Sequence, residues 1–317
     1  MSKRLIINAD DFGMTMGVNR AVVEARQSGV LTSTTLMATG AAYEEAVQLA
    51  AQVKTLDVGC HVVLLEGSPL LPAAEIPSLA VKGVDGVTRF RRGFGAFIQA
   101  AIAGKLRGED IYREARAQIL HLRAAGVDVQ HLDTHKHAHV FPAVFRPLLR
   151  AALDCGVAAV RNPFEPMCAM SWHRLRHRRD LWSRYLPVRM LHAFSDQFAA
   201  ECQNLGIATP QGTFGITLTG YADEPSFIEL LDRIPDGNWE LLCHPAYEDE
   251  LWLKLGPRPG SGMRELELLL SPHVSATVRD NGIMLASYAE VFAGSRAAVA
   301  TAASAVPVLG DAAAPAA

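Results

Sequence analysis

The stretch RLIINADD, residues 4–11, places a short apolar run directly before two aspartates. An apolar run of this length that ends in polar residues predicts a buried strand. Residues 17–29, GVNRAVVEARQSG, follow with helical spacing, and Gly29 marks the end of the predicted helix. A buried strand joined to a helix by polar residues is the unit from which parallel α/β folds are built.

The same alternation of strand and helix continues along the chain. Further strands are predicted at TSTTLMAT (32–39), LDVGCHVVLL (56–65), VQHLDTH (129–135), VAAVRNP (157–163), TFGITLT (213–219), WELLCH (239–244) and GIMLASY (282–288). Helices are predicted between them at AYEEAVQLAAQ (42–52), EDIYREARAQILHLRAAG (109–126), PAVFRPLLRAALDCG (142–156), PSFIELLDRI (225–234) and MRELELLLS (263–271). This pattern predicts either a parallel β/α barrel or an open, doubly wound sheet.

The composition is that of a globular protein with a substantial core. Of the 317 residues, 50% are hydrophobic and 20% are charged. The net charge of −3 gives no electrostatic basis for general nucleic-acid binding. The five cysteines form no CxxC pair, which favours a reducing compartment. Without a signal-like or membrane-spanning run, we expect a cytoplasmic protein, with contact at the inner face of the membrane still open.

Two segments depart from this rhythm. Residues 163–193 include SWHRLRHRRDLWSRYLPVRMLH (171–192), which is rich in arginine and aromatic residues. Residues 294–317 are an alanine-rich, low-complexity tail that cannot build a core, and we predict that they are disordered. The sequence therefore predicts one domain over residues 1–293 with a basic, aromatic insertion, followed by the tail.

Polar side chains recur at the carboxyl ends of the predicted strands. They are Asp10, Asp11, His61, Asp133, His135, Arg161 and His244. In parallel α/β folds this edge carries the active site, because the loops that follow the strands converge there. Taken singly, the aspartates could be helix caps and the histidines could be hydrogen-bonded core residues. Their shared location favours a functional site.

Carboxylate and imidazole side chains together are the ligand set of zinc and similar first-row metals. A catalytic site leaves positions for water and substrate, so one aspartate and two histidines are enough to hold the ion. A second aspartate could accept a proton from the bound water, and a further histidine could protonate the leaving group. The pattern predicts metal-assisted hydrolysis at one divalent ion, with magnesium as the less natural alternative to zinc.

Five motifs, taken in order, resemble those of the YdjC-like carbohydrate deacetylases. They are NADDFG (8–13), TSTTLMATG (32–40), GCHVVLLEG (59–67), HLDTHKHAHVFP (131–142) and LLCHPAY (241–247). The resemblance runs from Leu5 to about Val291. It implies an α/β fold, a distorted TIM-like β/α barrel of the glycoside hydrolase and deacetylase superfamily. It also implies metal-dependent hydrolysis that releases acetate from an N-acetylated amino sugar.

The resemblance further implies roles for individual residues. The metal ligands fall on Asp11, His61 and His135, while Asp10 resembles the general base and His244 the general acid. The roles of the two aspartates could be exchanged. Substrate-facing or supporting roles fall on Asp133, His137, His139 and Arg161.

Strand alternation gives independent support, because Asp133 and His135 are two residues apart and share a face. Arg161 has a structural ion pair as its alternative role. His137 and His139, on the loop beyond the strand, have the alternative of ordinary loop residues that orient the ligand.

Within this family the chain is most similar to the hopanoid-biosynthesis-associated deacetylases. The similarity lies in LLEGSPLLPAAEIPSL (64–79), in the HKHAH form of the histidine motif (135–139) and in the insertion. It implies a hopanoid-linked N-acetylglucosamine as substrate. The alternatives are a chitooligosaccharide deacetylase of the chitobiose type and a non-catalytic, metal-dependent sugar- or lipid-binding subunit. Other barrel metal hydrolases usually place H-x-H after the first strand, where this chain has two aspartates.

The insertion has two interpretations. It is either a solvated helix face packed over the barrel mouth or a lid that meets an amphiphilic substrate at an anionic membrane. The second interpretation places four arginines near lipid headgroups, namely Arg174, Arg176, Arg178 and Arg179. The sequence is also compatible with a homo-oligomer.

Overall fold

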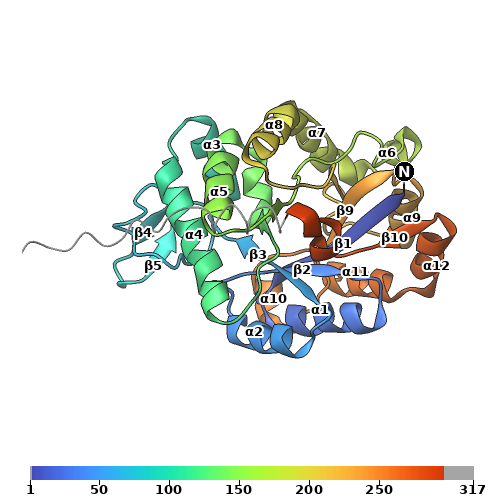
Figure 1. Ribbon diagram of the computed structural model, residues 1–317, viewed down its shortest axis with the longest axis horizontal. Helices are drawn as coiled ribbons and strands as arrows, with labels where there is room; N and C mark the ends of the chain where they lie inside the picture. The colour runs from blue at the N-terminus through green and yellow to red at the C-terminus, as the bar shows by residue number, and fades with distance from the viewer. Residues whose placement is uncertain (1, 296–317) are drawn as a thin grey trace, which may run out of the picture.

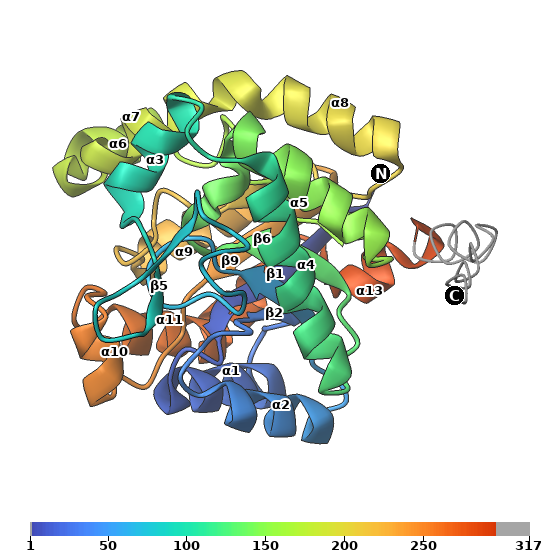
Figure 2. The ribbon, with the colours of Figure 1, turned by 90° about the vertical axis from the view of Figure 1, so that its left-hand side faces the viewer.

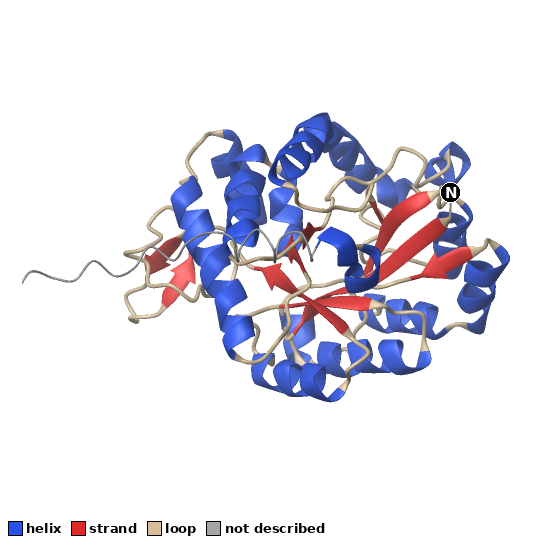
Figure 3. Ribbon diagram, viewed as in Figure 1, coloured by secondary structure: helices blue, strands red, loops and turns tan. Residues whose placement is uncertain are grey.

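The computed structural model describes residues 2–295, and its main sheet contains the eight predicted strands, all parallel (Figures 1 and 3). Their bounds are β1 (Lys3–Phe12), β2 (Ser33–Leu36), β3 (Asp57–Val62), β6 (His131–Thr134), β7 (Ala159–Val160), β8 (Thr213–Phe214), β9 (Gly237–Cys243) and β10 (Ile283–Leu285). The order across the sheet is β7-β6-β3-β2-β1-β9-β8, and β10 pairs with β1.

The sheet curls until one short segment of chain contacts both of its ends. Ala208 forms a parallel bridge with Ala159 of β7. A few residues later, Thr213 of β8 pairs with Glu240 of β9. The chain therefore has the α/β fold that the sequence predicts, a parallel sheet rolled into a distorted barrel.

The distortion centres on β1, the longest strand. One edge of β1 pairs with β9 from Lys3 to Ala9. The other edge is shared, because Lys3 to Leu5 pair with β10 and Asn8 to Phe12 pair with β2. Strand β1 thus lies between three neighbours, and its Leu5, Ile6 and Ile7 side chains are fully buried.

Helices cover the outside of the barrel (Figure 3). They are α1 (Met16–Ser28), α2 (Tyr43–Gln52), α4 (Gly108–Ala124), α5 (Pro142–Asp154), α8 (Ser195–Leu205), α9 (Glu224–Asp232), α11 (Ser261–Leu270), α12 (Pro272–Asp280) and α13 (Tyr288–Val291). Capping begins several of them: the Thr15 side chain accepts from Val18 N at α1, and Asp223 accepts from Ser226 N at α9. Apolar residues of most of these helices form one core with the strands, while Tyr288 of α13 packs in a second, small cluster with Ile6 and Ala159.

Several elements follow strand ends and surround the barrel mouth. They are the hairpin of β4 (Ala80–Lys82) and β5 (Thr88–Phe90), α3 (Phe94–Ile102), α6 (Trp172–His177), α7 (Trp182–Leu191) and α10 (Glu250–Lys254). The hairpin, α3 and α10 are not among the elements predicted from the sequence, and neither are the covering helices α8, α12 and α13.

Strand β8 is shorter than the sequence predicts, because Gly215 turns the chain with a φ of +94°. The predicted tail lies outside the described residues from position 296 onward. Across residues 2–295, helices long and apolar enough to traverse a bilayer are absent.

Candidate metal centre

Asp10 and Asp11 lie in an irregularity of β1. Successive residues of a regular strand point to opposite faces, so adjacent aspartates would not share a site. Here the pairing with β2 shifts register between Ala9 and Phe12, and Asp11 has a φ of +65°. Such a bulge redirects the side chains locally. Both carboxylates therefore reach the carboxyl end of the barrel, where they contact different partners.

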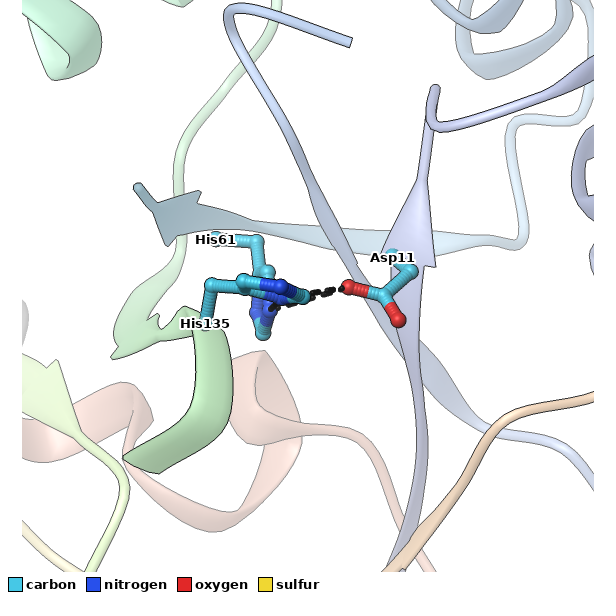
Figure 4. A group of neighbouring side chains, drawn as sticks. All are labelled: Asp11, His61 and His135. Carbon is cyan, nitrogen blue, oxygen red and sulfur yellow. Dashed lines mark hydrogen bonds and ion pairs between the residues drawn. The ribbon is translucent and has the colours of Figure 1, made fainter. Parts of the chain in front are cut away.

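Asp11 forms a compact cluster with His61 and His135 (Figure 4). Its Oδ1 lies 3.2 Å from His61 Nε2 and 3.0 Å from His135 Nδ1. The two imidazole nitrogens are 3.4 Å apart. His61 is 1% exposed, whereas Asp11 and His135 keep 15% and 13% of their side chains accessible. The cluster is thus buried on the side of His61 and accessible to solvent on the side of Asp11 and His135.

These donor atoms fit a divalent metal ion. One carboxylate and two imidazoles leave coordination positions for water and substrate, as catalytic zinc sites do. The remaining nitrogen of His61, Nδ1, lies 2.7 Å from Asp133 Oδ1. Thr35 Oγ1 donates to Asp133 Oδ2 at 3.0 Å. A carboxylate on the far side of a metal-binding imidazole fixes its tautomer and directs the free nitrogen to the ion.

A second group of potential ligand atoms is formed by Asp10, His61 and Asp133. The Arg161 guanidinium already contacts both carboxylates of this group, at 2.6 and 2.7 Å. A divalent ion there would face a fixed positive charge. The geometry therefore favours the group that contains Asp11.

Arg161 is fully buried and contacts three carboxylates. Its two terminal nitrogens bind Asp10 in a bidentate arrangement at 2.7 and 2.6 Å. The same guanidinium lies 2.7 Å from Asp133 and 2.7 Å from Glu240. Burial raises the pKa of Asp10, but the charge of Arg161 outweighs burial and holds this pKa well below its usual value. Asp10 is therefore ionised throughout the neutral range.

Opposing influences also set the pKa values within the cluster. Burial raises the pKa of Asp11, yet the adjacent His135 and His61 outweigh it and leave the pKa well below normal. Burial lowers the pKa of His61, but Asp133 and Asp11 outweigh it and raise this pKa well above normal. In the metal-free protein the raised pKa favours the protonated, positively charged form of His61, which offsets the charge of the adjacent carboxylates.

His244 follows β9 on the opposite side of Asp10. Its Nε2 lies 3.8 Å from Asp10 Oδ2, and 25% of the side chain is exposed. The backbone N–H of His244 donates to Glu265 Oε2 at 2.6 Å, and the same oxygen lies 3.8 Å from His244 Nδ1. Glu265 of α11 thus fixes the position of His244 beside Asp10.

The other histidines of the HLDTHKHAH segment lie outside the cluster. His131 is buried and stacks on Tyr288 with ring centroids 3.7 Å apart. His139 is also buried. Its Nδ1 lies 2.6 Å from Thr134 Oγ1, and its Nε2 lies 3.2 Å from the backbone oxygen of Arg161. Burial lowers the pKa of His139 to about 3, so its neutral ring holds the backbone at Arg161.

His137 differs from both. It lies with Lys136 in a short helical turn, His135–Val140, where both residues have positive φ. Burial and the Arg161 charge lower the pKa of His137 well below normal, and its Nδ1 has no hydrogen-bond partner among the described residues. Of the histidines in this segment, His135 therefore joins the carboxylate cluster and His137 lies nearby.

Sequence reasoning missed two carboxylates that organise the site. Glu240 contacts Arg161 and also accepts from Tyr288 Oη at 2.6 Å. Glu265 lies on a helix, far in sequence from His244. Glu240 left a signal, because a charged residue inside the apolar strand WELLC needs a buried partner. Glu265 left none, because it occupies an ordinary position of an amphipathic helix.

Together, the fold and the cluster define a β/α-barrel protein with a candidate mononuclear metal site at the carboxyl ends of its strands. The chain belongs to the YdjC-like protein family, whose model matches residues 4–280.

Curated relatives support this membership over nearly the whole chain. A carbohydrate deacetylase of Brevibacillus brevis is 34% identical and covers 91% of this chain and 99% of its own. One from Geobacillus stearothermophilus is 33% identical over 92% and 99% of the two chains. A crystal structure from Enterococcus faecalis, of a protein named for cellobiose-phosphate cleavage, has a TM-score of 0.69 at 27% identity and covers 91% and 98%.

Alanine substitution of Asp11, His61 or His135 should each abolish stoichiometric metal binding, because each removes one of only three protein ligands. Elemental analysis of the purified variants measures this. His137→Ala is the matched control from the same turn and should retain the metal. Stoichiometric metal in His135→Ala would assign the ligand to another histidine.

Metal binding should release a proton and should tighten as pH rises. The raised pKa means that His61 holds a proton at neutral pH in the metal-free protein, and the ion must displace it. Titration calorimetry in buffers of different ionisation enthalpy measures the release. An affinity that does not change with pH through the neutral range would contradict this expectation.

Proposed function

We propose that the protein is a metal-dependent carbohydrate N-deacetylase that hydrolyses the N-acetyl group of an amino sugar. The observation that carries the proposal is that two distinct groups of side chains lie next to each other at the strand ends. Asp11, His61 and His135 form the cluster that fits a metal, while Asp10 and His244 lie beside it with different partners. A metal site flanked by an ionised carboxylate and an imidazole is the equipment of amide hydrolysis.

Asp11, His61 and His135 would hold a divalent ion, which would supply an activated water and would polarise the acetyl carbonyl. Asp10 accepts the proton of the attacking water. Its bidentate contact with Arg161 fixes the carboxylate in position. The guanidinium is shared with Asp133 and Glu240, so its single charge is divided among three carboxylates. The same contact keeps Asp10 ionised, which is the form that can accept a proton.

His244 protonates the departing amine. Its ring lies across from Asp10, is accessible from the mouth, and is held by the backbone contact to Glu265. An acid and a base on different strands can act on opposite sides of the same scissile bond. The buried Arg161 acts through Asp10 and not on the substrate.

The substrate class follows from the relatives, and its finer identity from the insertion. Both curated relatives are named as carbohydrate deacetylases. We propose a hopanoid-linked N-acetylglucosamine, supported by the similarity of residues 64–79 and by the basic, aromatic insertion at the barrel mouth. Such a substrate would place the enzyme in the cytoplasm, at the inner face of the membrane. The alternative substrate is a chitobiose-type oligosaccharide.

Incubation of the metal-loaded protein with N-acetylglucosaminyl hopanoid and with diacetylchitobiose tests the proposal. Mass spectrometry should show loss of an acetyl group from the lipid-linked sugar, and a chelator should abolish it. Turnover of chitobiose alone would establish the alternative substrate. Metal-dependent sugar binding without acetate release from either compound would leave a non-catalytic binding subunit.

Asp10→Asn and His244→Ala should keep the metal and lose activity. Removal of a positioned acid or base typically costs about 10²–10⁴-fold in rate, whereas the metal ligands stay untouched. Turnover assays combined with metal analysis of the same preparations separate the two effects. Near-wild-type turnover in both variants would refute the assigned roles.

A further inference from the structure

The connection between β7 and α8 carries α6 and α7, and α7 presents an apolar face to solvent. On this helix Tyr185 and Leu191 pack against the core of the barrel. Trp182, Leu186 and Met190 recur every four residues and share another face. Their side chains are 36%, 58% and 70% exposed. A surface helix usually turns polar side chains to solvent, whereas this face of α7 exposes apolar ones.

Helix α6 extends the apolar face. Trp172 is 66% exposed, and its ring contacts that of Trp182 edge to face with centroids 5.5 Å apart. We call Trp172, Trp182, Leu186 and Met190 the apolar ridge. Contiguous exposed apolar side chains of this size mark interaction surfaces on soluble proteins.

Two of the four arginines that the sequence suggests for lipid contact have a different role. Arg174 Nε lies 2.8 Å from Glu229 Oε2, and Arg178 Nη1 lies 2.5 Å from Asp223 Oδ2. Both acidic residues belong to α9 or its cap. Arg174 and Arg178 thus hold the insertion on the barrel, and the expectation that they face headgroups is wrong.

Arg176 and Arg179 remain beside the ridge as exposed cations. Arg176 Nε lies 3.1 Å from His177 Nε2, and this contact with an imidazole does not neutralise the charge of the guanidinium. Among residues 2–295, no carboxylate forms an ion pair with either arginine. Asp180, the nearest acidic residue in sequence, is paired with Arg178. The surface around the ridge therefore keeps a net positive charge.

We propose that the apolar ridge, together with Arg176 and Arg179, docks the protein on an anionic phospholipid bilayer. Tryptophan and aliphatic side chains on one helix face enter the boundary between headgroups and acyl chains. Unpaired arginines at the rim attract anionic headgroups. A second copy of the chain fits less well, because a two-fold contact through the ridge would bring the unpaired arginines of both copies together.

The place of the ridge in the fold relates it to the metal centre. The insertion begins after β7, at the barrel end where Asp11, His61 and His135 lie. Figures 1 and 2 both show α6 and α7 above the strands of the barrel, with α10 and α11 below them. A bilayer held by the ridge lies next to the barrel end that carries the candidate site. Vesicle binding needs no substrate, so this proposal stands or falls separately from the proposed activity.

Sedimentation of the full-length protein with phosphatidylcholine vesicles, with and without phosphatidylglycerol, tests the proposal. The wild type should bind the anionic vesicles and should dissociate as salt screens the arginines. Arg176→Gln combined with Arg179→Gln should lower the partition coefficient roughly 30-fold, since each cation near an anionic surface contributes about fivefold. Leu186→Ser combined with Met190→Ser should abolish binding at every salt concentration.

Leu253→Ser combined with Leu255→Ser is the matched control, because these side chains are 46% and 55% exposed near α10. This variant should bind as the wild type does. Circular dichroism and metal content should be unchanged in all variants. Equal loss of binding in the control would overturn the proposal. It would also be overturned if the wild type ignored anionic vesicles while the ridge variant changed a dimer into a monomer, which would assign the ridge to a contact between copies.

Discussion

Arg161 brings one positive charge into a part of the barrel where Asp10, Asp133 and Glu240 have all been removed from water. Unpaired, each buried carboxylate would cost several kcal/mol, so each depends on this guanidinium. The dependence is mutual, because one arginine with three acceptors is fixed in a single orientation. It links β1, β6, β7 and β9 by charge where the backbone pairing of the short β7 is weak. The positions of Asp10 and of Asp133, the carboxylate behind His61, follow from it.

The two aspartates of β1 acquire different chemistry from one local irregularity. A regular strand would send Asp10 and Asp11 to opposite faces, and one of them would be lost to the site. The bulge keeps both at the barrel mouth but gives them different neighbours: a guanidinium for Asp10 and two imidazoles for Asp11. The guanidinium occupies the alternative metal position. The buried Arg161 guanidinium therefore disfavours a metal ion between Asp10 and Asp133 and leaves the group that contains Asp11 as the candidate site.

Much of the fold could be predicted, because most strands of the main sheet lie in short runs rich in apolar or β-branched residues, and most of the covering helices have clear periodicity. The residues at the strand ends could be predicted for the same reason. The pairing of Arg161 with Glu240 could not, because these residues are 79 positions apart and apolar periodicity carries no information on charge pairing. Nor could the sequence separate Arg174 and Arg178 from Arg176 and Arg179, since neighbouring arginines differ only in what the folded chain places opposite them.

The position of β1 between β9, β10 and β2 also bears on how the chain folds as it is made. Strand β1 leaves the ribosome before β9 and β10, and it lacks both neighbours until residues 237–285 have followed it. Pairing between segments far apart in the sequence forms slowly, because a long loop must close first. During synthesis the edge of β1 that later pairs with β9 stays exposed, which is the state in which nascent barrels aggregate or engage chaperones. The strand that supplies Asp10 and Asp11 is thus translated long before the two neighbours that complete its pairing.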